Sequence, residues 1–392
     1  MLVERAPETF RQKQNIDVRI RHEVVGLDLS RQRVQVEQAE NGKSSWESFD
    51  QLLIATGASP LCPDVPGSHA SGIHGVNTLD SGIRIRQVIE QKKPKRALIV
   101  GGGYIGLEMA EALVRQGLSV ALIERSSEVM NTLDTDMGAL VSDALRRIGV
   151  ELFVEQSLQA FEISGGEVSA VVTDKQNIPA DMVILGMGAR PNSDLAAKAG
   201  IPLGEKGSIR VNEKMQTDVE KIWAAGDCAQ TFHLVSRRPF YMPLGTVANK
   251  QGRVAGINLG GGNAAFPGVV GTAASRICDL EVARTGLMEK EIKQLGIEYA
   301  SATIKSRTRA GYYPNSGGIT VKLLAEKASG RLLGGQIVGA EGSAKRIDII
   351  AISLHAGFGV DQMINLDLSY APPFSIPWDP VVIAARNLVK LL

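Results

Sequence analysis

The chain has 392 residues, with 43 basic against 42 acidic side chains and a formal net charge of +1. A chain of this length is too long for a single hydrophobic core and is sufficient for two or three domains. The balanced charge provides no electrostatic attraction to nucleic acid or to an anionic membrane, so neither is expected as a partner. No apolar run reaches about 18 residues, and the first residues do not resemble a signal peptide, which favours a cytoplasmic location.

The three cysteines, Cys62, Cys228 and Cys278, are far apart in the sequence. They form no CxxC pattern, so neither a zinc site nor a disulfide framework is predicted.

The first 60 residues indicate strands. Apolar and polar residues alternate over 18–21 and again over 34–36, which is typical of half-buried strands. An apolar run over 52–55 then ends at Gly57 and Pro60, and this predicts a buried strand followed by a turn.

The segment 96–124 predicts a complete βαβ unit. Its expected parts are a strand over 97–100, a glycine-rich turn over 101–106, a helix over 104–116 and a strand over 119–123. Further along, we expect a helix over 134–148, apolar strands over 181–188 and 222–225, and a helix over 245–259.

The strongest chemical signal is the turn Gly101-Gly102-Gly103-Tyr104-Ile105-Gly106, because a strand precedes it and a helix follows it. Gly101 allows the tight turn, and Gly103 lets the backbone approach a pyrophosphate at the helix N-terminus. Gly106 lets the helix pack closely on the strand. A glycine-rich turn without a ligand is the alternative, and the context favours NAD binding.

An acidic residue, Glu124, closes the next strand and can accept a hydrogen bond from the adenine ribose 2′-hydroxyl. Its carboxylate would repel the 2′-phosphate of NADP, so NADH is favoured. The neighbouring Arg125 could accommodate that phosphate, which keeps NADPH as an alternative.

With the glycine turn, three other segments form an ordered set: Ala-Thr-Gly at 55–57, Gly-Ala-Arg-Pro-Asn at 188–192 and Ala-Gly-Asp at 225–227. In this order they resemble the pyridine nucleotide-disulfide oxidoreductase family. Ala-Gly-Tyr-Tyr-Pro at 310–314 and Tyr-Ala-Pro-Pro-Phe-Ser at 370–375 are similar to its coenzyme A disulfide reductase, NADH oxidase and persulfide reductase branch.

The resemblance implies an α/β fold. A Rossmann-like NAD(P)-binding domain at 76–193 would be inserted into an FAD domain at 1–75 and 194–266, and an α+β dimerisation domain would follow at 267–392. The implied activity is that of an FAD-dependent homodimer which passes a hydride from NADH to FAD and then reduces a small-molecule disulfide or persulfide. An NADH oxidase, a non-catalytic NAD-binding fragment and, more weakly, a rubredoxin- or ferredoxin-reductase-like carrier are the alternatives.

The resemblance also implies roles for individual residues. Those expected to hold NAD or to line its pocket are Gly101, Gly103, Tyr104, Gly106, Glu108, Glu124 and Gly188. Those expected to contact FAD are Thr56, Gly57, Asp227, Leu244, Gly245 and Thr246. Those expected to reach the partner subunit's active site are Tyr370 and one of Tyr312 or Tyr313. In the plainer interpretation Glu108 is an exposed helix residue, Asp227 caps a following helix and the tyrosines are half-buried packing residues.

The start of the sequence differs from the family's pattern. Members begin with their own βαβ unit and a first GxGxxG for FAD, followed by one redox-active cysteine in a pattern like SFxxCGxP. This sequence begins Met1-Leu2-Val3-Glu4 and contains neither, so we expect a truncated FAD domain without the redox cysteine. Cys228 is expected to point into packing. A piece of a longer reductase and a shortened protein are both compatible with this sequence.

Overall fold

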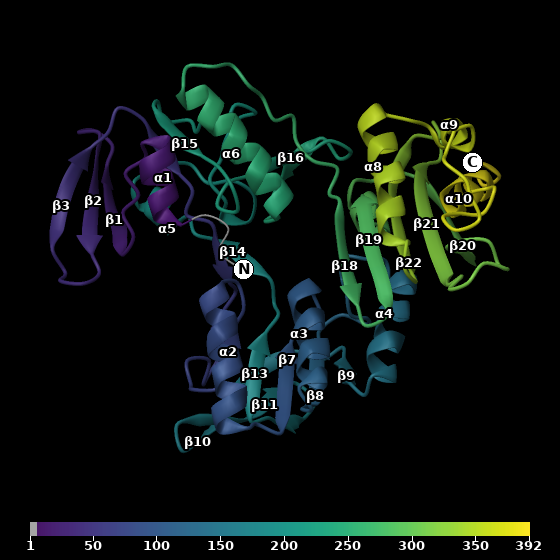
Figure 1. Ribbon diagram of the computed structural model, residues 1–392, viewed down its shortest axis with the longest axis horizontal. Coiled ribbons are helices and arrows are strands. Elements are labelled where there is room, and N and C mark those ends of the chain that lie inside the picture. Colours follow the sequence, from purple (N-terminus) through teal and green to yellow (C-terminus); the bar gives the residue numbers. More distant parts are fainter. Residues whose placement is uncertain (1–5) are drawn as a thin grey trace. The chain divides into compact units, whose positions relative to one another are not determined.

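The structure is a computed structural model that describes residues 6–392 (Figure 1). The chain forms two compact units and passes between them several times. The first unit contains the residues up to 58 together with 191–231 and 239–267, and the second contains 59–190, 232–238 and 268–392. Four short strands lie where the chain passes between the units: β5 (Ala58–Pro60), β14 (Ala189–Pro191), β16 (Thr231–His233) and β17 (Arg238–Phe240).

The first unit combines an antiparallel sheet with a parallel strand pair. The sheet has the order β1-β2-β3 and consists of β1 (His22–Asp28), β2 (Arg33–Gln38) and β3 (Ser44–Ser48). The parallel pair is β4 (Leu52–Ile54) with β15 (Ile222–Ala224). The helical elements are α1 (Pro7–Gln14), α5 (Asp194–Lys198), the 3₁₀ turn η1 (Glu205–Gly207) and α6 (Gly245–Leu259).

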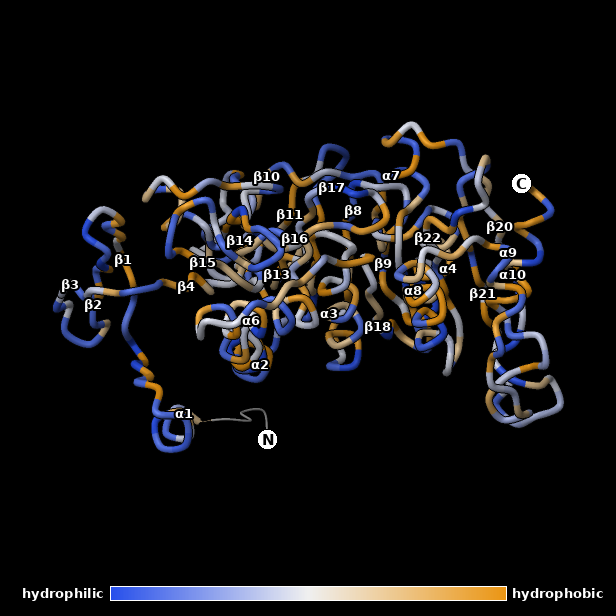
Figure 2. Tube along the Cα trace, turned by 90° about the horizontal axis from the view of Figure 1, so that it is seen from above, coloured by the Kyte–Doolittle hydropathy of each residue, from blue (hydrophilic) through white to orange (hydrophobic). Residues whose placement is uncertain are grey.

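The strand predicted over 18–21 is wrong, whereas the strand predicted over 34–36 is confirmed as part of β2. Residues 18–21 lie outside any strand, and Arg21 has the left-handed φ of 57° that ends the extended run just before β1. The hydrophilic helix α1 was not predicted (Figure 2). It begins with Pro7, whose ring fixes a helical φ, and ends at Asn15 in the left-handed conformation.

The second unit begins with a five-stranded parallel sheet of order β6-β13-β7-β8-β9. Its strands are β6 (Ile73–Gly75), β7 (Arg96–Val100), β8 (Ser119–Glu124), β9 (Glu151–Val154) and β13 (Met182–Leu185). Its helices are α2 (Leu79–Lys92), α3 (Tyr104–Arg115) and α4 (Thr135–Arg147), and the antiparallel strands β10 (Leu158–Ser164), β11 (Glu167–Thr173) and β12 (Asn177–Pro179) form a separate small sheet. The βαβ unit predicted over 96–124 is therefore confirmed as β7, α3 and β8.

The C-terminal part of the second unit is an antiparallel sheet of order β18-β19-β22-β21-β20 (Figure 1). Its strands are β18 (Ala273–Ile277), β19 (Leu280–Gly286), β20 (Tyr299–Arg307), β21 (Gly318–Glu326) and β22 (Leu332–Gly339). The helical elements here are α7 (Glu289–Gln294), η2 (Ala344–Arg346), α8 (Ile347–Ala356), α9 (Val360–Ile364) and α10 (Pro380–Val389).

The two faces of this antiparallel sheet have different neighbours. Ala283 and Ile337 belong to a core shared with α8 and α10. Val282 and Val338, which alternate with them, belong to the core of the parallel sheet with α3 and α4. Because successive side chains of a strand point to opposite faces, one face of the C-terminal sheet shares a core with the layer formed by the parallel sheet, α3 and α4.

Within residues 6–392, no helix combines the length and the apolar character needed to cross a bilayer.

In the second unit, shortly after the chain enters it at residue 232, His233 is almost completely buried, with 2% of its surface exposed. Its Nδ1 atom accepts a hydrogen bond from the Ser236 N–H at 3.2 Å. Burial lowers the pKa of His233 from 6.5 to about 4, and the charge of Arg284 acts in the same direction. The imidazole is therefore neutral in the folded protein at neutral pH.

Acidification should destabilise the protein through this histidine. Below pH 6.5 the unfolded chain takes up a proton that the folded chain refuses until about pH 4. The free energy of unfolding should therefore fall by about 3 kcal/mol over this range on account of His233 alone. Denaturant unfolding at pH 7 and at pH 4 checks this against His233→Asn, whose amide oxygen can replace the Nδ1 acceptor. Parallel pH profiles for the two proteins would contradict the prediction.

Candidate functional site

The glycine turn between β7 and α3 is packed too closely for side chains at two positions. Gly101 has a φ of 98°, and a Cβ atom there would lie 2.8 Å from the carbonyl oxygen of Gly186. A Cβ atom on Gly106 would lie 2.1 Å from the carbonyl oxygen of Gly101. The local fold itself therefore requires glycine at 101 and 106.

Gly103 is different, because neither its backbone nor its packing demands glycine. Its φ is −81°, and a Cβ atom would meet only the Gly186 carbonyl oxygen, at an ordinary 3.5 Å. It is the N-cap of the 12-residue helix α3 and provides no side-chain cap, so the first N–H groups of the helix lack a side-chain acceptor. An uncapped helix N-terminus behind an open glycine fits a phosphate group.

Glu124 connects this turn to the loop that follows β8. The side chain is buried, with 4% of its surface exposed. Its Oε2 accepts the Gly102 N–H at 2.8 Å, and its Oε1 accepts the Ser126 N–H at 2.9 Å. Each carboxylate oxygen can accept a further hydrogen bond, so the carboxylate can hold the turn and still bind a ribose hydroxyl.

The remaining residues predicted to bind NAD lie in helix α3 or follow strand β13. Tyr104 is half-buried in the first turn of α3, and burial raises the pKa of its hydroxyl. Glu108, one turn later, is exposed and accepts a hydrogen bond from the Ser275 hydroxyl at 2.6 Å. Gly188 follows β13 with a φ of 101°, and nothing lies within 4 Å of a Cβ atom placed there. Because β13 pairs in parallel with β7, Gly188 and the glycine turn follow strand ends at the same edge of the sheet.

A second strand edge, in the first unit, brings together three of the motifs. Strands β4 and β15 pair in parallel, so Thr56 and Gly57 follow one carboxyl end and Asp227 follows its neighbour. Asn192 joins them: its side-chain amide donates to the Thr56 carbonyl oxygen at 2.9 Å, and its N–H donates to the Gly57 carbonyl oxygen at 2.9 Å. In open parallel sheets such edges are where ligands bind.

Asp227 carries a buried acceptor with no internal partner. Its Oδ1 atom is inaccessible to solvent and makes no hydrogen bond. Burial raises the pKa of this carboxyl group, because the charged form is poorly solvated. A turn, not a helix, follows Asp227, so it does not cap a helix as the plainer interpretation supposed. A buried acceptor without a donor fits the hydroxyl-rich chain of a flavin cofactor.

The first turn of α6 lies near Gly226, the residue that precedes Asp227. A Cβ atom added to Gly226 would touch the Ala248 side chain in the first turn of α6 at 3.7 Å. The N-cap residue Leu244 provides no side-chain hydrogen bond, Gly245 and Thr246 are exposed, and a Cβ atom on Gly245 would meet open space. These features leave room for a ligand against the predicted FAD residues.

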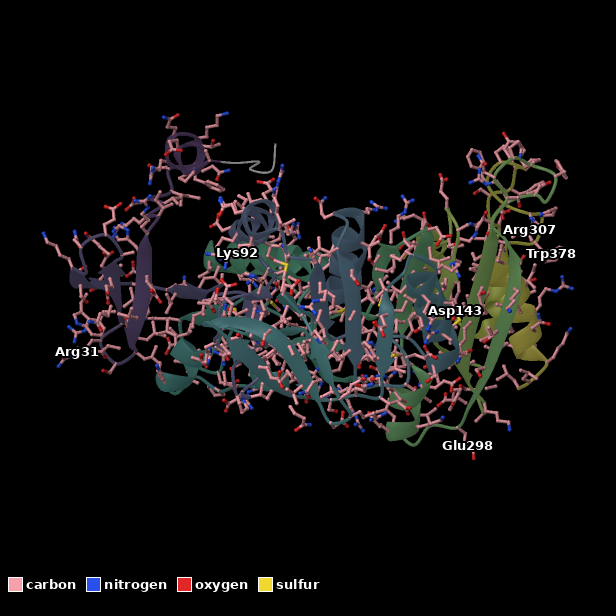
Figure 3. The ribbon with its side chains drawn as sticks, turned by 90° about the horizontal axis from the view of Figure 1, so that it is seen from below. Arg31, Lys92, Asp143, Glu298, Arg307 and Trp378 are labelled. Atoms are coloured by element: carbon pink, nitrogen blue, oxygen red, sulfur yellow. The ribbon has the colours of Figure 1, made fainter. Side chains whose placement is uncertain are left out.

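The three tyrosines lie on the surface of the C-terminal part. Tyr312 is 80% exposed and Tyr370 is 49% exposed, so Tyr312 in particular is no packing residue. Their loops are joined by the Ala310 N–H, which donates to the Pro372 carbonyl oxygen at 3.2 Å. Trp378, which was not among the predicted site residues, is also exposed in the C-terminal part, and the Arg386 guanidinium lies 4.4 Å from the centre of its ring (Figure 3). Exposed tyrosine side chains are more frequent at interfaces than elsewhere on a protein surface.

Two of the three cysteines are buried. The Cys228 thiol lies 3.4 Å from the carbonyl oxygens of Ile54 and Ala225, which confirms the prediction that it points into packing. Burial raises the pKa of the Cys278 thiol to about 11. Only Cys62 is exposed. Because the thiolate is the nucleophile, the raised pKa of Cys278 makes its thiol a poor nucleophile at neutral pH, and complete burial keeps the Cys228 side chain away from any substrate.

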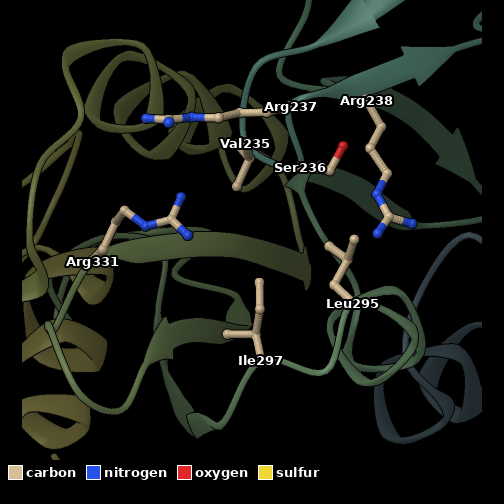
Figure 4. Close-up of a pocket in the computed structure, with 7 residues that line it drawn as sticks. All are labelled: Val235, Ser236, Arg237, Arg238, Leu295, Ile297 and Arg331. Carbon is tan, nitrogen blue, oxygen red and sulfur yellow. The ribbon is translucent and has the colours of Figure 1, made fainter.

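A separate pocket of about 410 Å³ lies in the second unit (Figure 4). It is lined by Val235, Ser236, Arg237, Arg238, Leu295, Ile297 and Arg331. None of the predicted site residues is among them, so the candidate sites are the open strand edges and not this pocket. Across residues 6–392, no group of three or more histidine, cysteine or acidic side chains is arranged to hold a metal ion.

One chain thus contains a glycine turn suited to a dinucleotide and a second strand edge suited to a hydroxyl-rich phosphate ligand. This combination defines a dinucleotide-binding α/β oxidoreductase. The chain belongs to the pyridine nucleotide-disulphide oxidoreductase family: the family model matches residues 3–252, and the model of its dimerisation domain matches residues 272–380. The family and the fold class predicted from the sequence are confirmed.

Similar proteins point to one branch of the family. The chain is 39% identical over 384 residues to the NAD(P)H coenzyme A polysulfide/persulfide reductase of Pyrococcus horikoshii, an alignment spanning 97% of this chain and 84% of that protein. It is 35% identical over 393 residues to the NADH oxidase of Methanocaldococcus jannaschii, spanning 100% and 87%. The solved NAD-dependent persulfide reductase from A. fulgidus matches with a TM-score of 0.95 and 38% identity, over 99% of this chain and 72% of that one.

Replacing Gly103 should separate dinucleotide binding from folding. Gly103→Ala should fold normally because its Cβ atom has room, and it should weaken NADH binding about tenfold because that atom occupies the approach to the pyrophosphate. Gly106→Ala is the contrasting variant, and it should lose about 2 kcal/mol of stability through overpacking. Thermal melts and nicotinamide fluorescence titrations measure both. Wild-type NADH affinity in Gly103→Ala would contradict the assignment.

Replacing Asp227 should have opposite effects on stability and on flavin retention. Below its ordinary pKa of 3.8 the carboxyl is protonated in both folded and unfolded chains, so its burial costs little. As the pH rises above 3.8, the unfolded chain loses this proton before the folded chain does, because burial raises the pKa in the folded state. The free energy of unfolding therefore falls until the pH exceeds the folded pKa. When both proteins are compared without flavin, Asp227→Asn should therefore gain stability relative to the wild type between pH 4 and pH 7. As purified, the variant should retain less flavin than the wild type. Denaturant unfolding at both pH values and the flavin absorbance measure this, and a pH-independent stability difference would refute it.

Proposed function

We propose that this protein is an FAD-dependent NADH oxidoreductase that reduces a sulfur–sulfur bond in a persulfide or disulfide of coenzyme A. The observation that carries the proposal is the presence of two strand-edge sites in one chain, one behind the uncapped α3 turn and one around the unpartnered Oδ1 atom of Asp227. The names of the Pyrococcus and A. fulgidus relatives support the choice of acceptor.

The proposed roles follow from the local chemistry of each residue. Gly101, Gly103 and Gly106 bring the N–H groups of α3 to the pyrophosphate of NADH, and Glu124 accepts from its adenine ribose. Asp227 accepts from the hydroxyl chain of FAD, which supplies a ring able to take up a hydride from NADH.

Further residues complete the proposed flavin and nicotinamide sites. Thr56, Gly57, Leu244, Gly245 and Thr246 border the flavin. Tyr104, Glu108 and Gly188 border the nicotinamide.

The acceptor distinguishes this proposal from an NADH oxidase, whose acceptor is oxygen. Reduction of a disulfide by this family's chemistry needs a reactive thiolate. Cys228 and Cys278 are buried, and Cys62 lacks the family's sequence context. The similarity to the Methanocaldococcus NADH oxidase supports an NADH oxidase as the second candidate.

The experiment that tests the function begins with the visible spectrum of the purified chain after gel filtration. We expect a flavin band that NADH bleaches without oxygen and that coenzyme A persulfide or disulfide restores. Recovery with oxygen alone would favour the oxidase. A colourless protein that still binds NADH would overturn the flavoenzyme proposal for this chain and leave a nicotinamide-binding fragment.

We also propose a homodimer in which Tyr370 and either Tyr312 or Tyr313 reach the partner subunit's active site. The match to a dimerisation domain and the exposure of these tyrosines support it. A monomer in light scattering at micromolar concentration would count against it. The division at residues 75, 193 and 266 and the cytoplasmic location stay predictions.

NADH should bind at least about tenfold more tightly than NADPH, because the buried Glu124 carboxylate repels a 2′-phosphate. Fluorescence titration with both nucleotides measures the ratio. Glu124→Gln removes the charge while keeping the shape, and it should narrow the ratio; Arg125→Gln should widen it. Comparable affinities for the two nucleotides in the wild type would refute the preference.

A further inference from the structure

A row of polar side chains crosses the C-terminal sheet on the face that meets the nucleotide-binding layer. Arg284 of β19 is the register partner of Gln336 in β22, which is the partner of Lys322 in β21, which is the partner of Thr303 in β20. Arg284, Gln336 and Lys322 are buried. A buried polar row is costly unless each member has a partner, so its contacts are informative.

The row contacts alternate residues of one segment of the nucleotide-binding layer. Arg284 donates to the carbonyl oxygen of Thr132 at 3.2 Å. Gln336 makes two hydrogen bonds with Asp134, accepting its N–H at 2.8 Å and donating to its Oδ2 at 2.7 Å. The Thr303 hydroxyl donates to the Asp136 carboxylate at 3.3 Å.

Lys322 is the charged centre of this contact. Its side chain is 4% exposed, and its ammonium group lies 3.1 Å from the Asp134 carboxylate, 2.7 Å from that of Asp136 and 2.8 Å from that of Glu289. Burial alone would lower the pKa of Lys322, but the hydrogen bonds to Asp136 and Glu289 outweigh it and raise the pKa. The lysine is therefore charged at neutral pH.

Asp134 makes a further contact on the sheet side. Its Oδ1 accepts the Glu289 N–H at 2.9 Å. Although Asp134 is the N-cap residue of α4, its side chain caps no N–H of that helix. Its carboxylate instead contacts Gln336 and Lys322 of the C-terminal sheet and the first residue of α7, so it ties this segment to the C-terminal part of the unit.

The segment held by the row also supports the glycine turn. The Met130 N–H donates to the Gly102 carbonyl oxygen at 2.7 Å, and the Met130 carbonyl oxygen accepts the Leu133 N–H at 2.7 Å. A Cβ atom on Gly102 would lie 2.9 Å from the Val129 side chain. Asp134, whose carboxylate Lys322 holds, therefore directly follows Leu133, the last residue of the hydrogen-bonded turn that begins at Met130 and supports Gly102.

We propose that Lys322 and Asp134 are positioning residues for NADH: through the segment 129–134 they hold the glycine turn in its binding conformation. The inference rests on the proposed use of NADH by this turn. It makes the affinity for the dinucleotide depend on a contact with the C-terminal sheet, because releasing Asp134 lets the segment under Gly102 move. Neither residue is proposed to touch the nucleotide.

The test compares NADH binding in two variants of the intact chain that lose the same charge. Asp134→Asn should weaken NADH binding about tenfold. Asp181→Asn is the matched control: its carboxylate accepts the N–H groups of Lys95 and Arg96 at 3.0 and 2.9 Å, at the opposite, amino-terminal edge of the parallel sheet. This variant should lose stability and keep NADH affinity within about twofold of wild type. Titrations are run well below the melting temperature of either variant.

Hydrogen exchange of the Met130 amide gives a second readout that needs no nucleotide. It should accelerate in Asp134→Asn and not in Asp181→Asn. Should Asp134→Asn fail to fold, Gln336→Met removes two hydrogen bonds of the row without leaving an unpaired charge, and it should show the same pattern more weakly.

The outcomes separate the inference from the proposed function. If the wild type binds NADH and Asp134→Asn binds it equally well, the positioning role is overturned and the function stands. If both variants weaken binding alike, the effect is one of general stability and the positioning role is again overturned. If the wild type binds no NADH, the proposed function fails and the inference fails with it.

Discussion

The close packing of the glycine turn on the end of β13 is the constraint on which the nucleotide-binding layer depends. Gly101, Gly106 and Gly186 approach so closely that a Cβ atom on Gly106 would lie 2.1 Å from a carbonyl oxygen. This approach brings the start of α3 against the sheet and leaves its N–H groups facing the strand edge. Gly103 then remains open, and Glu124 can reach Gly102 with a buried carboxylate oxygen. A side chain at Gly106 would separate the helix from the sheet and displace these groups together.

The same layer is also held from the side of the C-terminal sheet. Val282 and Val338 share its core, and the polar row at Gln336 and Lys322 lies on the same face. A sheet that serves dimerisation in this family therefore also forms one wall of the nucleotide-binding layer. The apolar contacts between the two layers are non-directional and tolerate small shifts of one layer against the other. The hydrogen bonds and ion pairs at Asp134 are directional and fix the position of the segment that contains it. Affinity for a nucleotide and order in the C-terminal sheet are coupled by this arrangement.

The second strand edge, formed by β4 and β15, differs because it contains a buried hydrogen-bond acceptor to which no protein group donates. The Oδ1 atom of Asp227 is buried without a donor, and such an atom destabilises a chain unless a ligand supplies the donor. Asn192 and Thr56 fix the neighbouring backbone with paired hydrogen bonds, so the edge is ordered around this carboxylate. Part of the stability of the folded unit is thus given up to bind a ligand.

The sequence by itself determined the elements whose signals are local: the apolar strand, the glycine turn and the helix of the βαβ unit all lie within 96–124, and each follows from residue types a few positions apart. It also indicated Asp227 by the order of its motifs. It did not determine helix α1, where polar residues gave no periodic signal, nor the strand boundary at Arg21. Only the tertiary structure brought Asn192 to Thr56 and Lys322 to Asp134, pairs separated by 136 and 188 positions. Such pairs leave no mark on local periodicity, since their partners are chosen by the register and packing of distant strands.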